Sequence, residues 1–455
     1  MRSLKSKYPC VLALVMFCLF PMTVVNAQVS DPRFDEYMDA TVKLSRFNGH
    51  VLIARNGKVV FSRGYGMANF EEDIPNTSQT KFRLASITKS FTAMAVMMLR
   101  DKGKLHLQDS VCKHLTDCPE TWKPITLRHL LNHTSGIADY VSAPDFMRTI
   151  SVRVTNDELI ASFKHKPLLS APGEQFAYSN SNYILLGRII ETLSGQPYGV
   201  FVKENIFAPL RMNNSGYDDN STPIKHRAIG YIKQNNRLVN ARYMDMTNAY
   251  SAGALYSTAE DLLLWNQALD TEKLVSKKSL DEIFTPGKGG VGYGWFINRM
   301  AHRLLITQSG LNSGFAAHIL RYSEEKACVI LLNNFENAAP HLARIGHDLS
   351  AILFGERYEL PRERVAVKVN TKIYDLYVGE YEFGANRMIT ITREDDRLFA
   401  QRGGAPKAEI LPESETTFFL TVADVQLVFL RDAAGKVSGM TLHANGQEMK
   451  GNKVK

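Results

Sequence analysis

Apolar residues recur at every third or fourth position in several stretches of the chain, which is the spacing of one helix face. This spacing predicts an amphipathic helix that follows Lys89 and ends near Gly103. It predicts further helices over residues 31–47, 183–193 and 340–354. Gly355 stands directly after the last of these, at the position of a helix cap.

Short apolar runs predict strands on both sides of a long helical region. His50–Ala54 and Val59–Tyr65 flank Asn56-Gly57, which is a strong hairpin signal. Helical patterns and long loops dominate residues 108–277. Strand signals then return at residues 294–297, 303–307, 315–322 and 326–332. The order predicts a mixed α/β fold of the α+β type, with an antiparallel sheet assembled from both ends of the region, flanking helices and a helical subdomain.

The last part of the chain has a different pattern. Residues 356–371 contain Pro361 and a run of mixed charge, which is typical of a linker. Residues 372–455 carry short strand signals separated by turns, at 388–392, 418–420, 426–430 and 439–442. We therefore expect a main domain over residues 28–355, a linker, and a small antiparallel β barrel or sandwich at the C-terminus.

Residues 1–27 have the pattern of a secretory signal peptide. Three basic residues precede the apolar run Val11–Phe20, and a small-residue cleavage site ends at Ala27. Ten apolar residues are too few for the roughly 30 Å hydrocarbon core of a bilayer. We expect cleavage after Ala27, a periplasmic or secreted protein, and no stable membrane insertion afterwards.

Charge and cysteine content change this picture little. Loss of residues 1–27 lowers the formal charge from +8 to +5, and no cluster of Lys and Arg with interleaved aromatic residues predicts a nucleic-acid partner. In an oxidising compartment Cys112 and Cys118 could close a small loop. Cys328 lies within an apolar strand and is expected to be buried, as are Trp122, Trp265 and Trp295.

Candidate chemistry starts at the head of the predicted helix near Lys89. Ser86 and Lys89 are three residues apart and therefore share a helix face. A helix start offers unpaired N–H groups and partial positive charge, which favour a serine alkoxide. The pair predicts a nucleophile and its base, although a capping serine followed by a solvated lysine has the same spacing.

Two further segments carry candidate groups. After a Pro-Gly turn, Tyr178 could relay a proton and Asn180 could bind a substrate carbonyl, although Tyr178-Ser179-Asn180 also suits a helix cap. The stretch Ile306–Phe315 is a predicted strand end that turns through two glycines, and it could offer a backbone N–H to an oxyanion. A plain hairpin turn explains that stretch as well.

The ordered set of motifs resembles the serine β-lactamase and penicillin-recognising superfamily. Ser86-Ile87-Thr88-Lys89 matches its Ser-x-x-Lys motif, and Tyr178-Ser179-Asn180 matches its Tyr-x-Asn motif. Residues 125–136 and 251–261 resemble two segments of the branch that holds class C β-lactamases, DD-peptidases and related esterases. The resemblance spans residues 31–355 and implies the β-lactamase/transpeptidase-like fold, while the tail resembles an appended lipocalin-like β domain.

The resemblance implies a mechanism for this sequence. Ser86 would attack a carbonyl and become acylated, while Lys89 and Tyr178 would share the proton transfers. The backbone N–H groups of Ser86 and Leu311 would form the oxyanion hole, and water would release the acyl group. The substrate would be a small molecule or peptide with an ester, amide or lactam carbonyl, and neither a metal nor an organic cofactor is implied.

The substrate-binding residues implied by the resemblance include one departure from the family pattern. Asn180 would hold a substrate amide, and Gln308, Ser309 and Gly310 form the third motif. That motif usually begins with Lys or His, which helps to bind a substrate carboxylate. Neutral Gln308 favours esters or amides without a carboxylate over penicillins.

Rival interpretations concern other residues. Gln308 also suits a catalytically weak or inactive penicillin-binding or sensor-like protein that is acylated without turnover. His129 and His133, four apart on a predicted helix, have a spacing that can bind zinc, but the metalloprotease Glu is missing. Gly287–Gly292 superficially resembles a phosphate-binding loop, but it lacks the Gly-Lys-Ser/Thr ending, so a flexible loop is the better interpretation.

Overall fold

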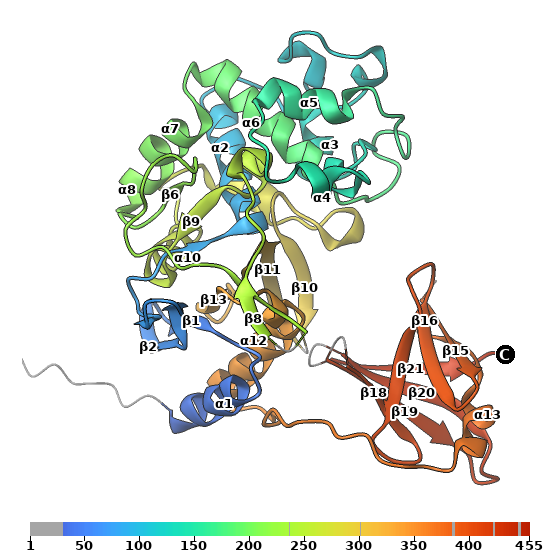
Figure 1. The fold of residues 1–455 in the computed structure, drawn as a ribbon. Coiled ribbons are helices and arrows are strands. Elements are labelled where there is room, and N and C mark those ends of the chain that lie inside the picture. Colours follow the sequence, from blue (N-terminus) through green and yellow to red (C-terminus); the bar gives the residue numbers. More distant parts are fainter. Residues whose placement is uncertain (1–30, 236, 301, 385–386, 422–423, 445–446) are drawn as a thin grey trace, which may run out of the picture.

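The computed structural model describes residues 31–455 except 236, 301, 385–386, 422–423 and 445–446. The predicted signal peptide, residues 1–27, lies outside the described residues. Figure 1 shows a large domain with helices above a sheet, and a separate β domain set to one side. Among the residues that the structure describes, none of the helices is long and apolar enough to cross a membrane.

The centre of the large domain is a six-stranded antiparallel sheet built from both ends of the predicted region, which confirms the expected topology. Its strands, in sheet order, are β10 (Phe296–Met300), β11 (Arg303–Asn312), β12 (Phe315–Tyr322), β13 (Ala327–Asn333), β1 (Gly49–Arg55) and β2 (Lys58–Tyr65). The strand β1 pairs with both β2 and β13, so residues as far apart in the chain as Gly49 and Asn333 become neighbours.

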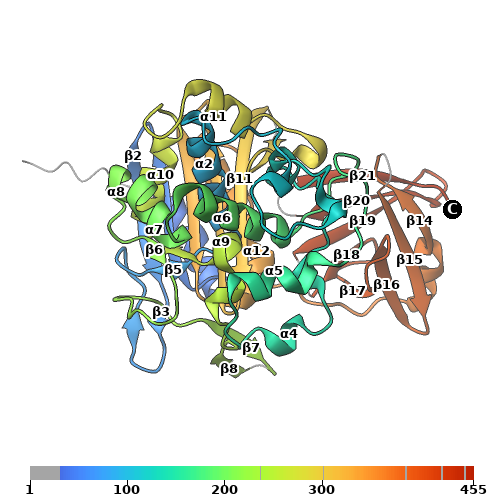
Figure 2. The same ribbon diagram turned by 90° about the horizontal axis from the view of Figure 1, so that it is seen from above.

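Helices cover both faces of this sheet. On one face α1 (Pro32–Lys43) and α12 (Ala339–Phe354) pack against β1, β12 and β13 around Tyr37, Val51 and Leu349. The other face packs against the helical region seen from above in Figure 2. Because β13 is buried on both faces, its sequence is a continuous apolar run up to Asn333. Strand β12 is buried as well, although it includes His318 and Arg321. Helix α1 is shorter than predicted, because Asp31 caps its start and Leu44 ends it.

The helical region lies between β5 and β10 in the chain. Its helices after α2 (Thr88–Asp101) are α3 (Leu127–Leu131), α4 (Phe146–Thr149), α5 (Asn156–Lys164), α6 (Asn180–Ser194), α7 (Tyr198–Val202), α8 (Ala208–Leu210), α9 (Tyr250–Gly253), α10 (Ala259–Ala268) and α11 (Lys277–Ile283). Short strands that the hydrophobic pattern did not predict are β3 (Met67–Asn69), β4 (Ile74–Pro75), β5 (Phe82–Arg83), β6 (Gly216–Tyr217), β7 (Tyr231–Gln234), β8 (Arg237–Asn240) and β9 (Leu255–Ser257).

Helix α2 runs through the middle of the domain and is buried on every side from Thr88 to Leu99. The predicted amphipathic helix would expose one face to solvent, and that part of the prediction was therefore wrong. Polar residues are tolerated there because they bond to backbone carbonyls: Ser90 Oγ donates to Ile87 O at 2.8 Å, and Thr92 Oγ1 donates to Ser251 O at 2.7 Å. The helix ends close to the predicted position.

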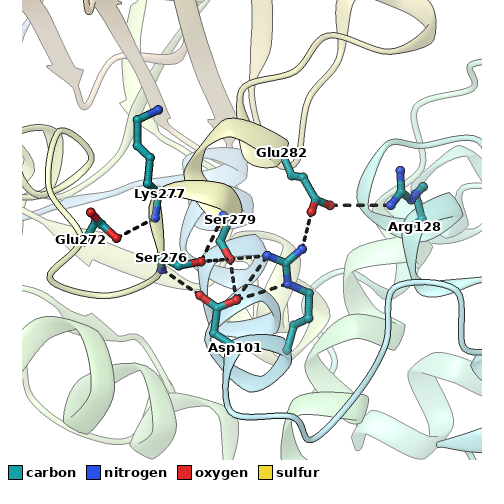
Figure 3. Close-up of polar contacts among 8 residues, drawn as sticks. Asp101, Arg128, Glu272, Ser276, Lys277, Ser279 and Glu282 are labelled. Atoms are coloured by element: carbon teal, nitrogen blue, oxygen red, sulfur yellow. Dashed lines mark hydrogen bonds and ion pairs between the residues drawn. The ribbon is translucent and has the colours of Figure 1, made fainter.

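A polar network fixes the C-terminal end of α2 to α11. Figure 3 shows Asp101 in contact with Ser276 and Ser279 at the start of α11. The Asp101 carboxylate accepts hydrogen bonds from Ser276 N at 2.8 Å and from Ser279 Oγ. Arg100, the neighbour of Asp101, reaches Glu282 in α11 at 2.6 Å. This network fixes the end of α2 that lies far from Ser86.

The C-terminal domain is a closed eight-stranded barrel, which decides between the predicted barrel and sandwich. Its strands are β14 (Gly379–Glu382), β15 (Met388–Glu394), β16 (Arg397–Arg402), β17 (Ala408–Pro412), β18 (Thr417–Leu420), β19 (Val425–Arg431), β20 (Val437–Ala444) and β21 (Gln447–Lys453). A short helix, α13 (Tyr374–Tyr377), precedes them. The barrel has a hydrophobic core of its own, centred on Tyr377, Phe418 and Phe429.

The cysteine and tryptophan predictions are confirmed. Cys112 and Cys118 form a disulfide, and Cys328 is a buried free thiol in β13. Burial raises the pKa of the Cys328 thiol to about 12, so it is not a reactive nucleophile at neutral pH. All three tryptophans belong to the hydrophobic core of the large domain.

Candidate active site

Ser86 lies in a short 3₁₀ turn, η1 (Ala85–Ile87), between β5 and α2. The pairing of β5 with β9 fixes the entry to this turn, and Leu84 N donates to Leu255 O at 2.8 Å. Ser86 Oγ lies 3.0 Å from Lys89 Nζ and 3.0 Å from Tyr178 OH. The structure therefore brings together the three predicted catalytic residues from two separate segments.

Lys89 is fully buried, with a relative exposure of 0%, and three oxygen atoms surround its Nζ. Nζ donates to Ser86 Oγ, to Asn180 Oδ1 at 2.8 Å and to Ala252 O at 2.9 Å. Ala252 belongs to α9 in the matched segment 251–261, which explains one function of that segment. The other two partners are an amide oxygen and a backbone carbonyl, so Ser86 Oγ is the one nucleophilic group among the three partners of Lys89 Nζ.

The position of Tyr178 is fixed by contacts with His133. The ring of His133 stacks on the Tyr178 ring, with centroids 4.5 Å apart, and His133 Nδ1 accepts a hydrogen bond from Ser179 N at 3.2 Å. The backbone contributes as well, because Ala177 N donates to His133 O at 2.9 Å. The matched segment 125–136 is thus the support for the Tyr178 loop.

His133 is neutral in this position. Burial, and secondarily the nearby Lys89 charge, lower the pKa of His133 to about 3. A neutral imidazole leaves Nδ1 free to accept from Ser179 N. His133 follows α3 in a left-handed conformation with φ of 57°, so the prediction that it shares a helix with His129 was wrong. His129 instead accepts from Thr126 N and caps α3.

Asn180 opens α6 and has both ends of its amide engaged. Its Oδ1 accepts from Lys89, and its Nδ2 donates to Asp139 Oδ2 at 2.9 Å. Asp139 also accepts from Asn180 N at 3.1 Å. Burial raises the pKa of the Asp139 carboxyl, although hydrogen bonds from Val141 N and Asn180 oppose that shift. Asp139 thereby sets the orientation in which Asn180 faces Lys89, a role that the sequence motifs did not predict.

The predicted oxyanion-hole strand lies beside Ser86. Strand β10 pairs with β11 only as far as Thr307, so residues 308–312 have a free edge opposite β12. Backbone N–H groups alternate between the two sides of an antiparallel strand. Ser309 N points to the free side, where it donates to Gln308 Oε1 at 3.1 Å, and Leu311 N therefore points to the same side.

Gly310 lets β11 lie close to the turn that carries Ser86. A Cβ atom at Gly310 would lie 2.1 Å from Leu84 O and 3.0 Å from Ser86 N. Only glycine therefore lets β11 lie against the turn that carries Ser86. The prediction that the strand turns at this glycine was wrong, because β11 continues to Asn312 and the turn falls at Ser313-Gly314.

Gln308 is buried, with a relative exposure of 2%, and its side chain reaches Gly294, which lies against the backbone of Lys89 and Ser90. Its Nε2 donates to Gly294 O at 3.0 Å. With its Oε1 on Ser309 N, the amide ties β11 to the loop before β10. Ser309 is exposed on the opposite face of the strand.

The rival sites predicted from other motifs have structural functions here. Among the described residues, none of the groups of His, Cys, Asp and Glu could hold a metal ion. Gly287–Gly292 contains a short 3₁₀ turn at Lys288–Gly290, and Lys288 Nζ donates to Glu174 O at 2.7 Å near the Tyr178 loop.

Comparison with known families assigns residues 33–351 to a family described as β-lactamase. The chain belongs to the β-lactamase family. Members of this family are generally serine hydrolases. Residues 363–453 match a second family, described as a domain of unknown function (DUF3471), which covers the barrel.

Relatives in the β-lactamase family agree with this assignment. Penicillin-binding protein 4* of Bacillus subtilis (strain 168) is 32% identical over 89% of this chain and 94% of the relative. An octameric penicillin-binding protein homologue from Pyrococcus abyssi is 26% identical, with a TM-score of 0.67 over 92% of this chain and 99% of the homologue. D-amino acid amidase from Ochrobactrum anthropi SV3 is 25% identical, with a TM-score of 0.62 over 70% of this chain and 98% of the amidase.

Proposed function

We propose that the protein is an exported serine hydrolase that acts through a Ser86 acyl-enzyme on ester, amide, peptide or β-lactam carbonyls. The observation that carries this proposal is the position of Ser86 Oγ, 3.0 Å from both Lys89 Nζ and Tyr178 OH. A nucleophile within hydrogen-bond reach of two groups that can exchange its proton has the geometry required for nucleophilic catalysis.

The reaction would proceed in two stages. Ser86 Oγ would attack the carbonyl carbon while its proton passes to deprotonated Lys89 or Tyr178, and the oxyanion would accept from Ser86 N and Leu311 N. The proton would then pass to the leaving group as the bond to it breaks. Water would attack the ester formed on Ser86 and release the acid. Asn180, Gln308, Ser309 and Gly310 would border the bound substrate.

Steady-state and burst kinetics test this proposal. The parent protein should release p-nitrophenol continuously from an activated ester, and Ser86→Ala should fall to the background rate. Equal hydrolysis by the parent and Ser86→Ala would contradict the proposal.

Neutral Gln308 favours one rival, a weak or inactive penicillin-binding or sensor-like protein. A stoichiometric burst on an activated ester or a labelled penicillin, without later turnover, would support that rival instead of the hydrolase.

Export is the second part of the proposal. The signal-peptide pattern of residues 1–27 supports it, and so does the Cys112–Cys118 disulfide, because disulfides persist in oxidising compartments. When the full chain is produced in a secreting bacterium, the protein recovered outside the cytoplasm should begin at Gln28. Recovery of the intact chain from the cytoplasm alone would contradict export.

A further inference from the structure

Two hollows open beside Ser86. One has a volume of about 250 Å³ and lies between the start of α4, α9 and the β11–β12 turn. Its wall is largely apolar and includes Tyr140, Phe146, Met147, Ile150, Met244 and Leu311. The second, of about 490 Å³, follows β11 past Gln308, Ser309 and Gly310. An apolar wall next to the nucleophile fits an apolar substituent of the substrate.

The charge of these hollows is one-sided. Of the described residues that line them, Glu336 is the only acidic one, and none is Lys or Arg. His318 lines the second hollow, but burial lowers its pKa to about 3, so it is neutral. Penicillins and peptides with a free C-terminus carry a carboxylate. Neither hollow offers such a carboxylate a cationic side chain.

Glu336 is held in place at the end of the apolar hollow. It begins the 3₁₀ turn η8 (Glu336–Ala338) that leads into α12, and its Oε2 accepts from Gly314 N at 2.8 Å. Among the described residues it forms no ion pair, and its other carboxylate oxygen has no hydrogen bond. A half-buried carboxylate without a cation, in a hollow that includes Ser86, is suited to a positively charged ligand.

Asn312 supplies a second polar group at the same end. It lines the apolar hollow at the last position of β11, and both Oδ1 and Nδ2 of its amide are buried without a hydrogen-bond partner. Buried amides are normally paired, so an amide with neither atom paired indicates a missing partner. An ammonium group donates up to three hydrogen bonds and could be shared between Glu336 and a slightly rotated Asn312.

We propose that the acyl part of the substrate is apolar and carries an ammonium group, which Glu336 recognises across the apolar hollow. This inference rests on the proposed acyl transfer to Ser86. It adds a substrate class, which is esters or amides of cationic, apolar acids, and it makes Glu336 a specificity-determining residue.

Three matched esters test the inference on the mature full chain. We would measure kcat/KM for the p-nitrophenyl esters of hexanoate, 6-ammoniohexanoate and adipate, with Ser86→Ala subtracted as background. The parent should prefer the cationic ester to the neutral one, and the anionic ester should be the poorest. In Glu336→Gln the ratio of cationic to neutral kcat/KM should fall by about 5-fold, as expected for one partly screened ion pair.

The apparent kcat/KM for each ester scales with the fraction of folded protein. The ratio of cationic to neutral kcat/KM within one variant therefore does not depend on that fraction. Glu324→Gln is the matched control, because exposed Glu324 lies at the opposite end of the β12–β13 pair. It should keep the parental ratio. A ratio that Glu336→Gln leaves unchanged, or a parent that prefers the anionic ester, would overturn the inference while leaving the hydrolase intact. If Ser86 released p-nitrophenol from none of the esters, both the proposed function and the inference would fail.

Discussion

At the scale of single residues, the site is held together by side chains outside the Ser-x-x-Lys and Tyr-x-Asn motifs. Ser86, Lys89 and Tyr178 could be predicted, because the ordered Ser-x-x-Lys and Tyr-x-Asn motifs match those of the superfamily that the sequence resembles. The functions of His133 and Asp139 could not, because each depends on contacts with residues more than 40 positions away. No local pattern distinguishes a histidine that supports a tyrosine from one that caps a helix, as His129 does.

The hydroxyl of Tyr178 can be tested separately from its ring. Tyr178→Phe removes the group 3.0 Å from Ser86 Oγ and keeps the ring that stacks on His133. Loss of a general acid–base group should slow acylation by about 10²- to 10⁴-fold. Stopped-flow measurement of p-nitrophenol release gives the rate. Acylation at the parental rate would show that Tyr178 takes no part in proton transfer.

His133 is expected to act as a positioning residue. His133→Ala removes both the ring behind Tyr178 and the acceptor for Ser179 N, so kcat should fall by about 10²-fold, as for a misplacement of the reacting groups by 1 Å. His133→Asn keeps an acceptor and tolerates the φ of 57°, so it should recover part of kcat. Equal loss in both variants, together with an equal loss of thermal stability, would indicate a purely structural role.

At the scale of elements, the sheet and most of its helices were predictable, but the end of β11 was not. Val and Leu runs bounded by turns identify strands whatever surrounds them. Gly310 was interpreted as part of a turn, because glycine has the same local signature in a turn and at a close approach of two backbones. Only the packing of β11 against Leu84 and Ser86 distinguishes the two.

Gly310→Ala tests this packing directly. The new Cβ would overlap Leu84 O, so β11 must move away from η1 and carry Leu311 N with it. Loss of one oxyanion-hole donor should lower kcat by about 10²- to 10³-fold. Gly404→Ala is the control, because nothing lies within 4 Å of its Cβ position. If Gly310→Ala kept the parental kcat, the contact between β11 and η1 would not be needed for activity.

At the scale of the whole molecule, the chain divides into two domains with separate hydrophobic cores. Composition and turn spacing predicted this division. They could not decide between barrel and sandwich, because closure depends on the pairing of β14 with β21, which are more than 60 residues apart. All three tryptophans lie in the large domain, so tryptophan fluorescence reports the unfolding of that domain.

Buried histidines should make the large domain sensitive to acid. Burial lowers the pKa of His318 to about 3, far below 6.5, so between these values the unfolded chain binds a proton that the folded chain does not. Stability therefore rises with pH across this window and is lost as pH falls from 6.5 toward 3. His318→Gln should reduce the slope of the unfolding free energy against pH by about 1.4 kcal/mol per pH unit.

Urea unfolding followed by tryptophan fluorescence between pH 4 and 6 measures this slope. The matched control is His106→Gln, a substitution of an exposed histidine. A slope that His318→Gln leaves unchanged would show that His318 is not a buried neutral residue in the folded protein.

The central claim is that Ser86 is an activated nucleophile, and intact-mass spectrometry tests it most directly. The mature protein would be incubated with a fluorophosphonate and, separately, with a labelled penicillin, and the adducts would be mapped to peptides. We predict one fluorophosphonate adduct, at Ser86, that Ser86→Ala does not form. Absence of any adduct with either reagent in the folded protein, or equal labelling of Ser86→Ala, would contradict it.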